Sequence, residues 1–162
     1  MQTFYSHGKL LISAEYAVLD GALALALPTK FGQSLSVKSN SDNTILWNSI
    51  SSEGLVWFKA EFTIDTNLKI STTNTSEIAV RLVEVLNAVQ LLNPTLFNAD
   101  NGYVINSTLE FPENWGLGSS STLINNLAQW AQVDAFKLLE LTFGGSGFDI
   151  ACAQHDSGIL YQ

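Results

Sequence analysis

The sequence predicts an α+β domain in which short strands form an antiparallel or mixed sheet. Two patterns lead to this fold class. Up to residue 64 the chain is a series of short apolar runs, some of which alternate between apolar and polar residues. From residue 76 onward, apolar residues also recur at helical spacing. The 162 residues, 46% of them hydrophobic, suffice for one globular domain with its own core.

The expected strands lie mainly in the first part of the chain. The segment NSDNT at 40–44 has the composition of a turn between two of them, and residues 67–76 are polar enough for a loop. Two further strands are expected later, one of them at the end of the sequence. Together the strands are predicted at residues 4–6, 10–13, 22–27, 34–39, 55–64, 103–111 and 158–162.

Helical spacing begins after Ser76, which is the expected N-cap of the first helix. Its apolar face consists of Ile78, Leu82, Val85, Leu86, Val89 and Leu92. The Asn-Pro pair at 93–94 ends it. A second helix is marked by Leu123, Leu127 and Trp130. Phe136 lies in a further helical stretch, and Asp149 falls in the first turn of the last predicted helix.

Composition excludes several classes of function. Seven basic against fifteen acidic residues give a net charge of −8, the wrong sign for a surface that binds nucleic acid. Cys152 is the only cysteine, so no disulfide framework or cysteine-based zinc site is expected. The apolar stretch at 10–27 contains Glu15 and Asp20, which argues against a signal peptide or a membrane span. A cytoplasmic protein is predicted. The net charge does not exclude a small anion, such as a nucleotide, as a ligand.

The segment PENWGLGSSSTL at 112–123 joins a predicted strand to a predicted helix. A helix N-terminus has unpaired N–H groups and a partial positive charge, so glycines there let a phosphate approach the backbone. Ser120 or Ser121 could also lend an oxygen to Mg²⁺. A flexible linker is the alternative interpretation. The position of the segment between two elements of one core argues against it.

Three named motifs do not account for this segment. The P-loop is absent, because the only Gly-Lys pair, Gly8-Lys9, lacks both the first glycine and the following Ser or Thr. Gly116, Gly118 and Ser121 nearly match a dinucleotide fingerprint, but the βαβ context is missing. No G-x-S-x-G nucleophile elbow occurs in the sequence.

Two further segments carry candidate site residues. GKLLISAEYAVLDGALALALP, at 8–28, places Lys9 at a strand start and Glu15 just beyond that strand. GGSGFDIACA, at 144–153, places Asp149 in the first turn of a helix, after glycines that leave room beside it. For these three residues the alternatives are an exposed lysine, a solvated carboxylate at a turn, and a carboxylate stabilised by the helix dipole.

Together the three segments resemble the signature motifs of the GHMP kinases, a family of small-molecule kinases. The first motif is similar to P-G-K-x-x-x-x-G-E-[HY], the second to P-x-x-x-G-L-G-S-S-[AS] and the third to P-S-G-x-D, and they occur in the family's order. The wording GSGFDIA is most similar to mevalonate kinase-like members with a G-Y-D-I-A signature. The resemblance implies a ribosomal protein S5 domain 2-like fold, with helices packed on one face of the sheet.

The resemblance also implies roles for individual residues. Asp149 corresponds to the catalytic aspartate, and Lys9 to the lysine near it. Glu15 and Tyr16 correspond to a pair near the acceptor pocket, and Ser120 to a Mg²⁺ ligand. The segment around the phosphates of ATP corresponds to Pro112, Gly116, Leu117, Gly118, Ser119, Ser120 and Ser121.

The implied function is ATP- and Mg²⁺-dependent phosphorylation of a small alcohol, with mevalonate as the best single substrate. Phosphomevalonate or another substrate of the family is one alternative. The family has two domains, so residues 1–162 correspond to the N-terminal, ATP-binding domain, and the C-terminal domain is expected to be missing. A second alternative is an inactive binding or dimerisation module. A strand-like end at 158–162 is an exposed edge through which a homodimer could form.

Overall fold

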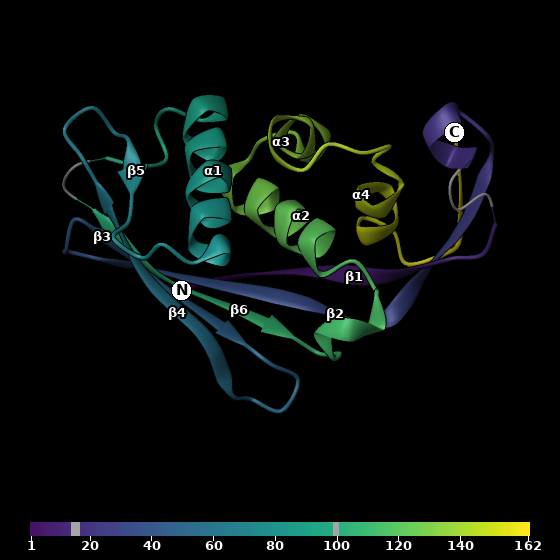
Figure 1. The fold of residues 1–162 in the computed structure, drawn as a ribbon, viewed down its shortest axis with the longest axis horizontal. Helices are drawn as coiled ribbons and strands as arrows, with labels where there is room; N and C mark the ends of the chain where they lie inside the picture. The colour runs from purple at the N-terminus through teal and green to yellow at the C-terminus, as the bar shows by residue number, and fades with distance from the viewer. Residues whose placement is uncertain (14–16, 99–100) are drawn as a thin grey trace.

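The computed structural model describes residues 1–13, 17–98 and 101–162. Within them the chain forms two layers, a sheet of seven strands and a layer of helices on one of its faces (Figure 1). This confirms the predicted α+β class and the packing of the helices on one side. None of the helices in the described residues is long and apolar enough to cross a membrane.

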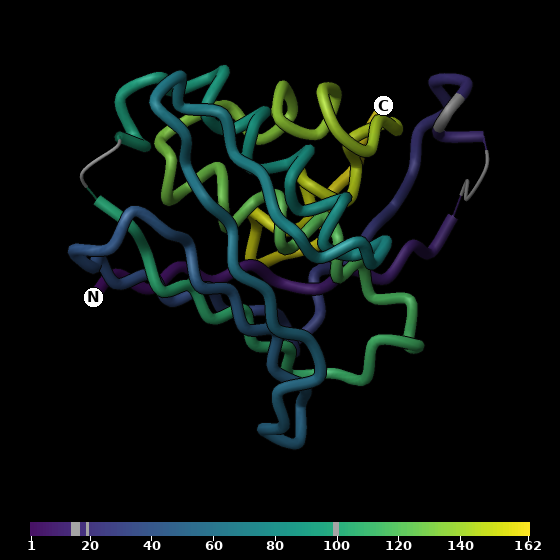
Figure 2. Tube along the Cα trace, turned by 60° about the vertical axis from the view of Figure 1, so that its left-hand side comes forward, coloured from purple at the N-terminus to yellow at the C-terminus, as the bar shows by residue number. Residues whose placement is uncertain are grey.

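The sheet has the strand order β1-β2-β6-β3-β4-β5, and β7 pairs with the outer part of β2. The pairs are antiparallel except for β3 and β6, which run parallel, so the sheet is mixed. Figure 2 shows the same sheet from another side, with the connection between β3 and β4 projecting beyond it. The strands are β1 (Gln2–Leu11), β2 (Ala24–Asn40), β3 (Thr44–Ile50), β4 (Val56–Ile64), β5 (Ile70–Ser71), β6 (Gly102–Leu109) and β7 (Ile159–Tyr161).

Apart from one short 3₁₀ helix near the start, the helices begin at residue 77 and alternate with the last two strands, β6 and β7. Ser76 caps α1 as predicted, since its side chain accepts a hydrogen bond from the Ala79 N–H. The helices are η1 (Ala17–Asp20), α1 (Glu77–Leu92), η2 (Glu113–Trp115), α2 (Ser119–Ala131), α3 (Ala135–Thr142) and α4 (Phe148–Ala153).

The observed strands differ from the predicted ones in length. The separate strands predicted at 4–6 and 10–13 are one strand, β1, and those at 22–27 and 34–39 are one strand, β2. The glycine and proline that suggested breaks are absorbed by a bulge, where the register shifts between His7 and Lys9. The sequence analysis missed β3, because Ser49 occupies an inward position and breaks its apolar alternation.

Two apolar cores hold the layers together. The larger one lies between the central strands and α1, α2 and α3, and its largest fully buried side chains include Trp47, Phe62 and Phe97. The smaller one packs α4 against the outer end of β2, through Phe148, Cys152, Ala24, Ala26 and Val18. The smaller core therefore determines where α4 lies on the sheet.

The interface between α2 and the first two strands is polar instead. The buried Asn126 amide donates to the Gln33 carbonyl oxygen and accepts from the Ser6 hydroxyl, both at 2.8 Å. Asn125 also donates to Ser6, and Gln154 at the end of α4 donates to Asn125. These bonds connect β1, β2, α2 and α4, and directional bonds in a buried setting specify one arrangement of the four elements.

The outer ends of β1 and β2, together with β7, extend past α4 and curl upward (Figure 1). We call residues 9–12, 23–28 and 159–161 the arm. Directly opposite residues on antiparallel strands share a face, and Leu10 lies opposite Leu27 while Leu25 lies opposite Leu160. Ala24 and Ala26 on the other face are buried against the smaller core. The outward face is apolar, and Leu10, Ile12, Leu23, Leu27 and Leu160 are 40–67% exposed.

Two neighbouring residues of β7 should respond differently to substitution. Leu160→Ser should change the free energy of unfolding by less than about 0.5 kcal/mol, because Leu160 is 67% exposed. Ile159→Ser should lower it by more than about 1 kcal/mol, since Ile159 packs against the smaller core. Urea unfolding measures both, and equal losses would contradict the assignment of the two faces. Leu160→Ser should also weaken any self-association seen by analytical ultracentrifugation.

Candidate functional site

The segment before α2 lies directly against β1. The Lys9 backbone N–H donates to the Leu117 carbonyl oxygen at 2.9 Å. A Cβ at Gly8 would lie 3.1 Å from that carbonyl and 2.7 Å from the Thr29 hydroxyl oxygen, so any larger residue would push the segment away. Glycine at position 8 therefore permits the contact between the first and second of the segments identified in the sequence.

Glycines turn the chain into α2. Gly116 and Gly118 have φ values of 67° and 83°, a conformation that residues with a Cβ adopt only at a cost. A Cβ at Gly118 would also lie 3.3 Å from carbon atoms of the Lys9 side chain and 3.7 Å from Asp149 Oδ1. Gly118 therefore brings the start of α2 against both of these side chains.

Lys9 and Asp149 form an ion pair. Lys9 Nζ lies 3.0 Å from Asp149 Oδ1, and both side chains are about three-quarters buried. Lys9 Nζ also lies 4.9 Å from the centre of the Phe148 ring, in a cation–π contact. The Oδ1 atom itself is buried and, among the described residues, accepts no hydrogen bond of good angular geometry. The contact with Lys9 is therefore an ion pair without hydrogen-bond geometry, and Oδ1 can still accept a hydrogen bond.

The first turn of α2 has free backbone donors. Gly118 is the N-cap and provides no side-chain cap, so the first N–H groups of the helix are available to an anion. Ser120 is exposed and Ser119 is half-buried, whereas Ser121 is buried beneath the turn. Pro112 is exposed and precedes η2, the single turn that leads into the glycines.

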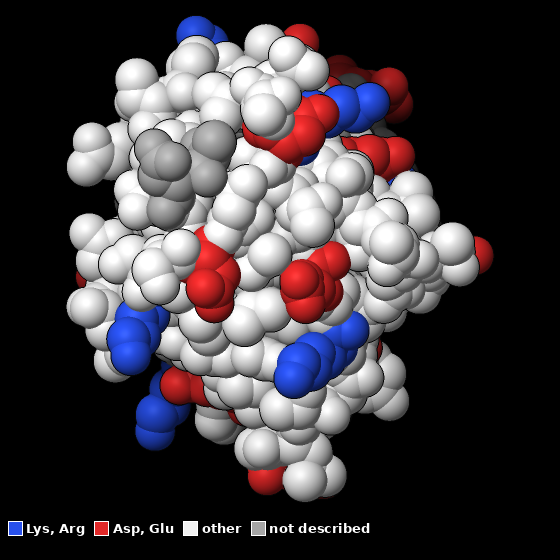
Figure 3. Space-filling view, turned by 90° about the vertical axis from the view of Figure 1, so that its left-hand side faces the viewer, with Lys and Arg blue, Asp and Glu red and all other residues white. Residues whose placement is uncertain are grey.

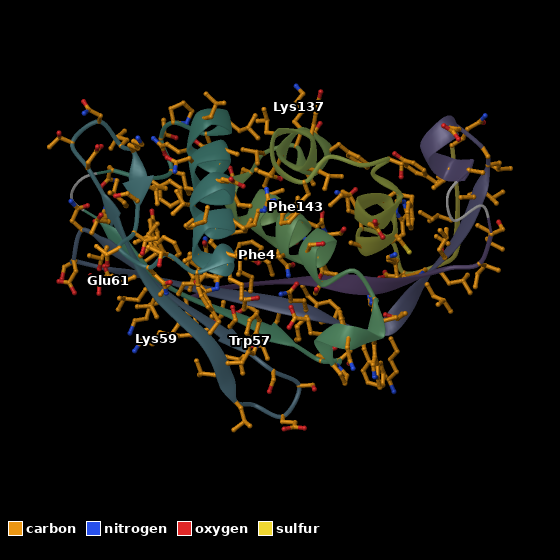
Figure 4. All side chains as sticks on the ribbon, in the orientation of Figure 1. Phe4, Trp57, Lys59, Glu61, Lys137 and Phe143 are labelled. Carbon is orange, nitrogen blue, oxygen red and sulfur yellow. The ribbon has the colours of Figure 1, made fainter. Side chains whose placement is uncertain are left out.

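A cavity of about 600 Å³ opens beside this turn. It lies between α1, the strands β3, β4 and β6, and the start of α2, and Ser119 and Ser120 are part of its wall. Figure 4 labels two further wall residues, Trp57 on the sheet and Phe143 in the helix layer. Because Gly118 and Ser119 are adjacent, the cavity and the ion pair meet at the start of one helix.

The walls of the cavity are largely apolar, and its charged residues lie on α1 and η2. Arg81 pairs with Glu84 at 2.6 Å and lies 5.1 Å from the centre of the Phe143 ring. Glu77 and Glu113 also line the cavity. On the face shown in Figure 3, basic side chains are interspersed with acidic ones and form no large basic patch.

The structure brings most of the predicted site residues together and leaves two undescribed. Lys9, Asp149 and the segment from Gly116 to Ser120 converge. Glu15 and Tyr16 lie outside the described residues. The sequence analysis missed the inner surface of the cavity, where Gln33, Ser49 and Ser107 provide polar groups. The available signal was a serine at an inward position in both β3 and β6.

Cys152 lies next to the ion pair but is buried in the smaller core. The pKa of its thiol is raised from 9.0 to about 11, mainly by burial and also by the Asp149 carboxylate, while the Lys9 ammonium acts in the opposite direction. At neutral pH the thiol is therefore protonated and unreactive.

Comparisons with known proteins show a similarity of fold. No protein-family model matches the chain, and no curated protein sequence is significantly similar to it. Among solved structures, mevalonate kinase from L. major in complex with R-mevalonate superposes with a TM-score of 0.67 at 17% identity. The match covers 100% of this chain and 49% of that one.

Two other kinases are similar to the chain to a comparable degree. Streptococcus pneumoniae phosphomevalonate kinase, in complex with phosphomevalonate and AMPPNP, has a TM-score of 0.63 at 17% identity, covering 94% of this chain and 47% of that one. Lactococcus lactis galactokinase, complexed with galactose, has a TM-score of 0.63 at 16% identity, covering 92% and 38%. The chain thus has the fold of the GHMP kinase domain and spans half or less of the length of these kinases.

The crowding around Gly118 can be tested against a matched glycine. Gly118→Ala should lower the free energy of unfolding by more than Gly116→Ala does, and both should be destabilising. Each variant pays the cost of a left-handed backbone, about 1–2 kcal/mol. Only Gly118→Ala also places a methyl group against Lys9, because nothing lies within 4 Å of a Cβ at Gly116. Thermal or urea unfolding measures the difference, and equal losses would contradict the contact.

The raised pKa of Cys152 predicts a pH dependence of stability. In the unfolded chain the thiol ionises near pH 9, whereas in the folded chain it does so near pH 11. Its contribution is therefore complete below about pH 9 and is lost as the pH rises toward 11. The fall in unfolding free energy over this range should be smaller in Cys152→Ala. Asp149→Asn should lower the pKa of the thiol, which alkylation rates measure, and no change would contradict the influence of the carboxylate.

Proposed function

We propose that the chain forms the nucleotide-binding half of a kinase that transfers a phosphoryl group from ATP to the hydroxyl of a small alcohol. The observation that carries this proposal is the ion pair of Lys9 and Asp149, packed against Gly118 at the uncapped start of α2. Phosphoryl transfer requires positioned donors for the phosphates, positive charge near the transferred group, and a carboxylate that orients the attacking hydroxyl. All three are present within one small region.

The start of α2 fits the phosphates of ATP. Its free N–H groups and the hydroxyls of Ser119 and Ser120 are donors, and the φ values of Gly116 and Gly118 direct the backbone around them. Pro112 and Leu117 hold the segment, the latter through its bond to the Lys9 N–H. Ser121 is buried, so its contribution is its backbone N–H. The adjacent cavity of about 600 Å³ is large enough for the base and sugar of the nucleotide.

The residues present fit a magnesium ion that is held mainly by the phosphates. Among the described residues, no group of three or more His, Cys, Asp and Glu side chains could hold a metal ion by itself. Mg²⁺ in kinases usually takes only one or two protein ligands and the phosphates. Ser120 and Glu113 line the same cavity and would hold it. When bound, the ion neutralises charge on the phosphates.

Asp149 and Lys9 act on the acceptor side of this arrangement. An oxygen of the Asp149 carboxylate accepts the proton of the attacking hydroxyl. Because Oδ1 is buried against Lys9 while 27% of the side chain is exposed, Oδ2 is the oxygen suited to that role. The Lys9 ammonium, 3.0 Å away, holds the carboxylate in position and provides positive charge toward the transferred group. Because both side chains are about three-quarters buried, both interactions are stronger than in bulk water.

Mevalonate is the proposed acceptor, with phosphomevalonate or another GHMP-kinase substrate as the alternative. This proposal is supported by the sequence GSGFDIA around Asp149 and by the similarity of fold to mevalonate kinase and phosphomevalonate kinase. Glu15 and Tyr16 are proposed to contact the acceptor. The reaction would take place in the cytoplasm, which agrees with a single cysteine that is buried and free.

We also propose that a second domain completes the site. The matched kinases are about twice as long as the region they share with this chain. The apolar outward face of the arm adjoins Lys9 and is exposed in the described residues, as expected for a surface that another domain covers. The same surface favours the second candidate function, a nucleotide-binding module that associates through the arm without turning over ATP.

Nucleotide turnover separates the two candidates. With mevalonate and Mg²⁺, Asp149→Asn should reduce the rate of ADP formation by about 10²- to 10⁴-fold, whereas Asp42→Asn, in a distant turn, should leave it unchanged. A coupled ADP assay measures the rates, and thermal stabilisation by ADP verifies that both variants bind nucleotide. ADP formation that persists in Asp149→Asn would sink the catalytic assignment. Nucleotide-dependent stabilisation without any turnover, in a protein that also carries the proposed second domain, would favour the binding module.

A further inference from the structure

The inner surface of the cavity contains a hydroxyl group whose proton has no acceptor. Ser49 on β3 is 8% exposed and lines the cavity. Its oxygen accepts a hydrogen bond from the Trp47 indole N–H at 3.0 Å. An indole nitrogen can only donate, so the oxygen of Ser49 must be the acceptor in this bond. The hydroxyl proton of Ser49 is therefore free to point elsewhere, and within the described part of the chain it has no partner.

The neighbouring polar groups are already engaged with one another. Ser107 on β6 lies beside Ser49 in the parallel register. The Gln33 side chain bonds to the Ser107 hydroxyl at 2.7 Å, and its other end bonds to the Thr122 hydroxyl. This chain of bonds leads from the inner surface of the cavity to the first turn of α2. Gln33 and Thr122 use their donors in these bonds, whereas the Ser107 oxygen, like that of Ser49, only accepts from an N–H group. Ser49 is the serine whose donor partner, the Trp47 indole, comes from its own strand.

The surroundings define what could accept this proton. The walls around Ser49 include Trp57, Ile78, Leu82 and Leu123, and the charged residues of the cavity lie on α1 and η2. An apolar ligand body fits these walls, and an unpaired buried donor favours an acceptor at the inner edge of that body. A nucleobase has both properties. The faces of its ring are apolar, and the ring nitrogens at its edge accept hydrogen bonds.

We infer that Ser49 donates a hydrogen bond to a ring nitrogen of the purine base and thereby helps to select the nucleotide. The inference rests on the proposed function, which places the phosphates at the start of α2. Ser49 is a binding residue in this scheme and has no part in the transfer itself. The Trp47 N–H occupies one acceptor position of the Ser49 oxygen and leaves the hydroxyl proton available, and the proposed contact with the base does not depend on that N–H.

The test removes the hydroxyl without leaving the indole N–H unpaired. Trp47→Phe eliminates that N–H, and the double variant Trp47→Phe with Ser49→Ala then removes only the hydroxyl. We expect the Kd for ADP with Mg²⁺, measured by isothermal titration calorimetry, to rise by about threefold to tenfold between the two variants. Urea unfolding verifies that both are folded. Ser34→Ala in the Trp47→Phe background is the control, because Ser34 lies on β2 outside the cavity lining and should not change the Kd.

Analogues of ADP identify the acceptor atom. We expect one of 1-deaza-, 3-deaza- and 7-deaza-ADP to bind Trp47→Phe more weakly than ADP does, and to bind the double variant as ADP does. Equal Kd values for ADP in the two variants would overturn the role of Ser49 and leave the kinase proposal intact. Equal binding of ADP and all three analogues to Trp47→Phe would overturn the ring-nitrogen acceptor. If the unsubstituted chain binds no ADP, the proposed function itself fails.

Discussion

The close approach of the segment before α2 to strand β1 is the constraint on which the site depends. Lys9 contributes to it twice, through its backbone N–H to the Leu117 carbonyl and through the side chain that packs on Gly118. Glycine at positions 8 and 118 is required because a Cβ at either position would meet its neighbour at 3.3 Å or less. The helix start, the lysine and the aspartate are brought together by this contact.

The rest of the fold holds the contact in place from two sides. The smaller apolar core presses α4 against β2, and so determines the position of Asp149. The polar interface under α2 determines the position of the helix start. The side-chain nitrogen of Asn126 bonds to β2, and its side-chain oxygen bonds to β1. A purely apolar interface would tolerate small sliding movements, whereas directional bonds at 2.8 Å allow far fewer positions. The polar interface therefore suits a helix whose first turn must be placed accurately.

Local electrostatics explain how an acidic protein can offer a site for an anion. The chain carries a net charge of −8, and Glu77 and Glu113 line the cavity. At the start of α2, however, the nearby groups are free N–H donors, serine hydroxyls and the Lys9 ammonium, which offsets the charge of the adjacent Asp149 carboxylate. The field at short range is set by these groups, because solvent screens exposed charges beyond about 10 Å. Net charge excludes an extended basic surface, and it leaves such a small site open.

The sequence by itself determined the class of fold, the starts of α1 and α2 and the candidate residues of the site. Those features depend on local patterns, such as the serine cap of α1, the glycines before α2 and the helical position of Asp149. Strand lengths and β3 could not be predicted from the chain alone, because pairing with neighbours overrides a glycine or proline break and tolerates Ser49 at an inward position. Only the tertiary structure decided that Ser49 lies in a cavity beside the helix start and that Lys9 meets Asp149. Such contacts join residues far apart in the chain, and they depend on sheet register and helix packing, which no local pattern encodes.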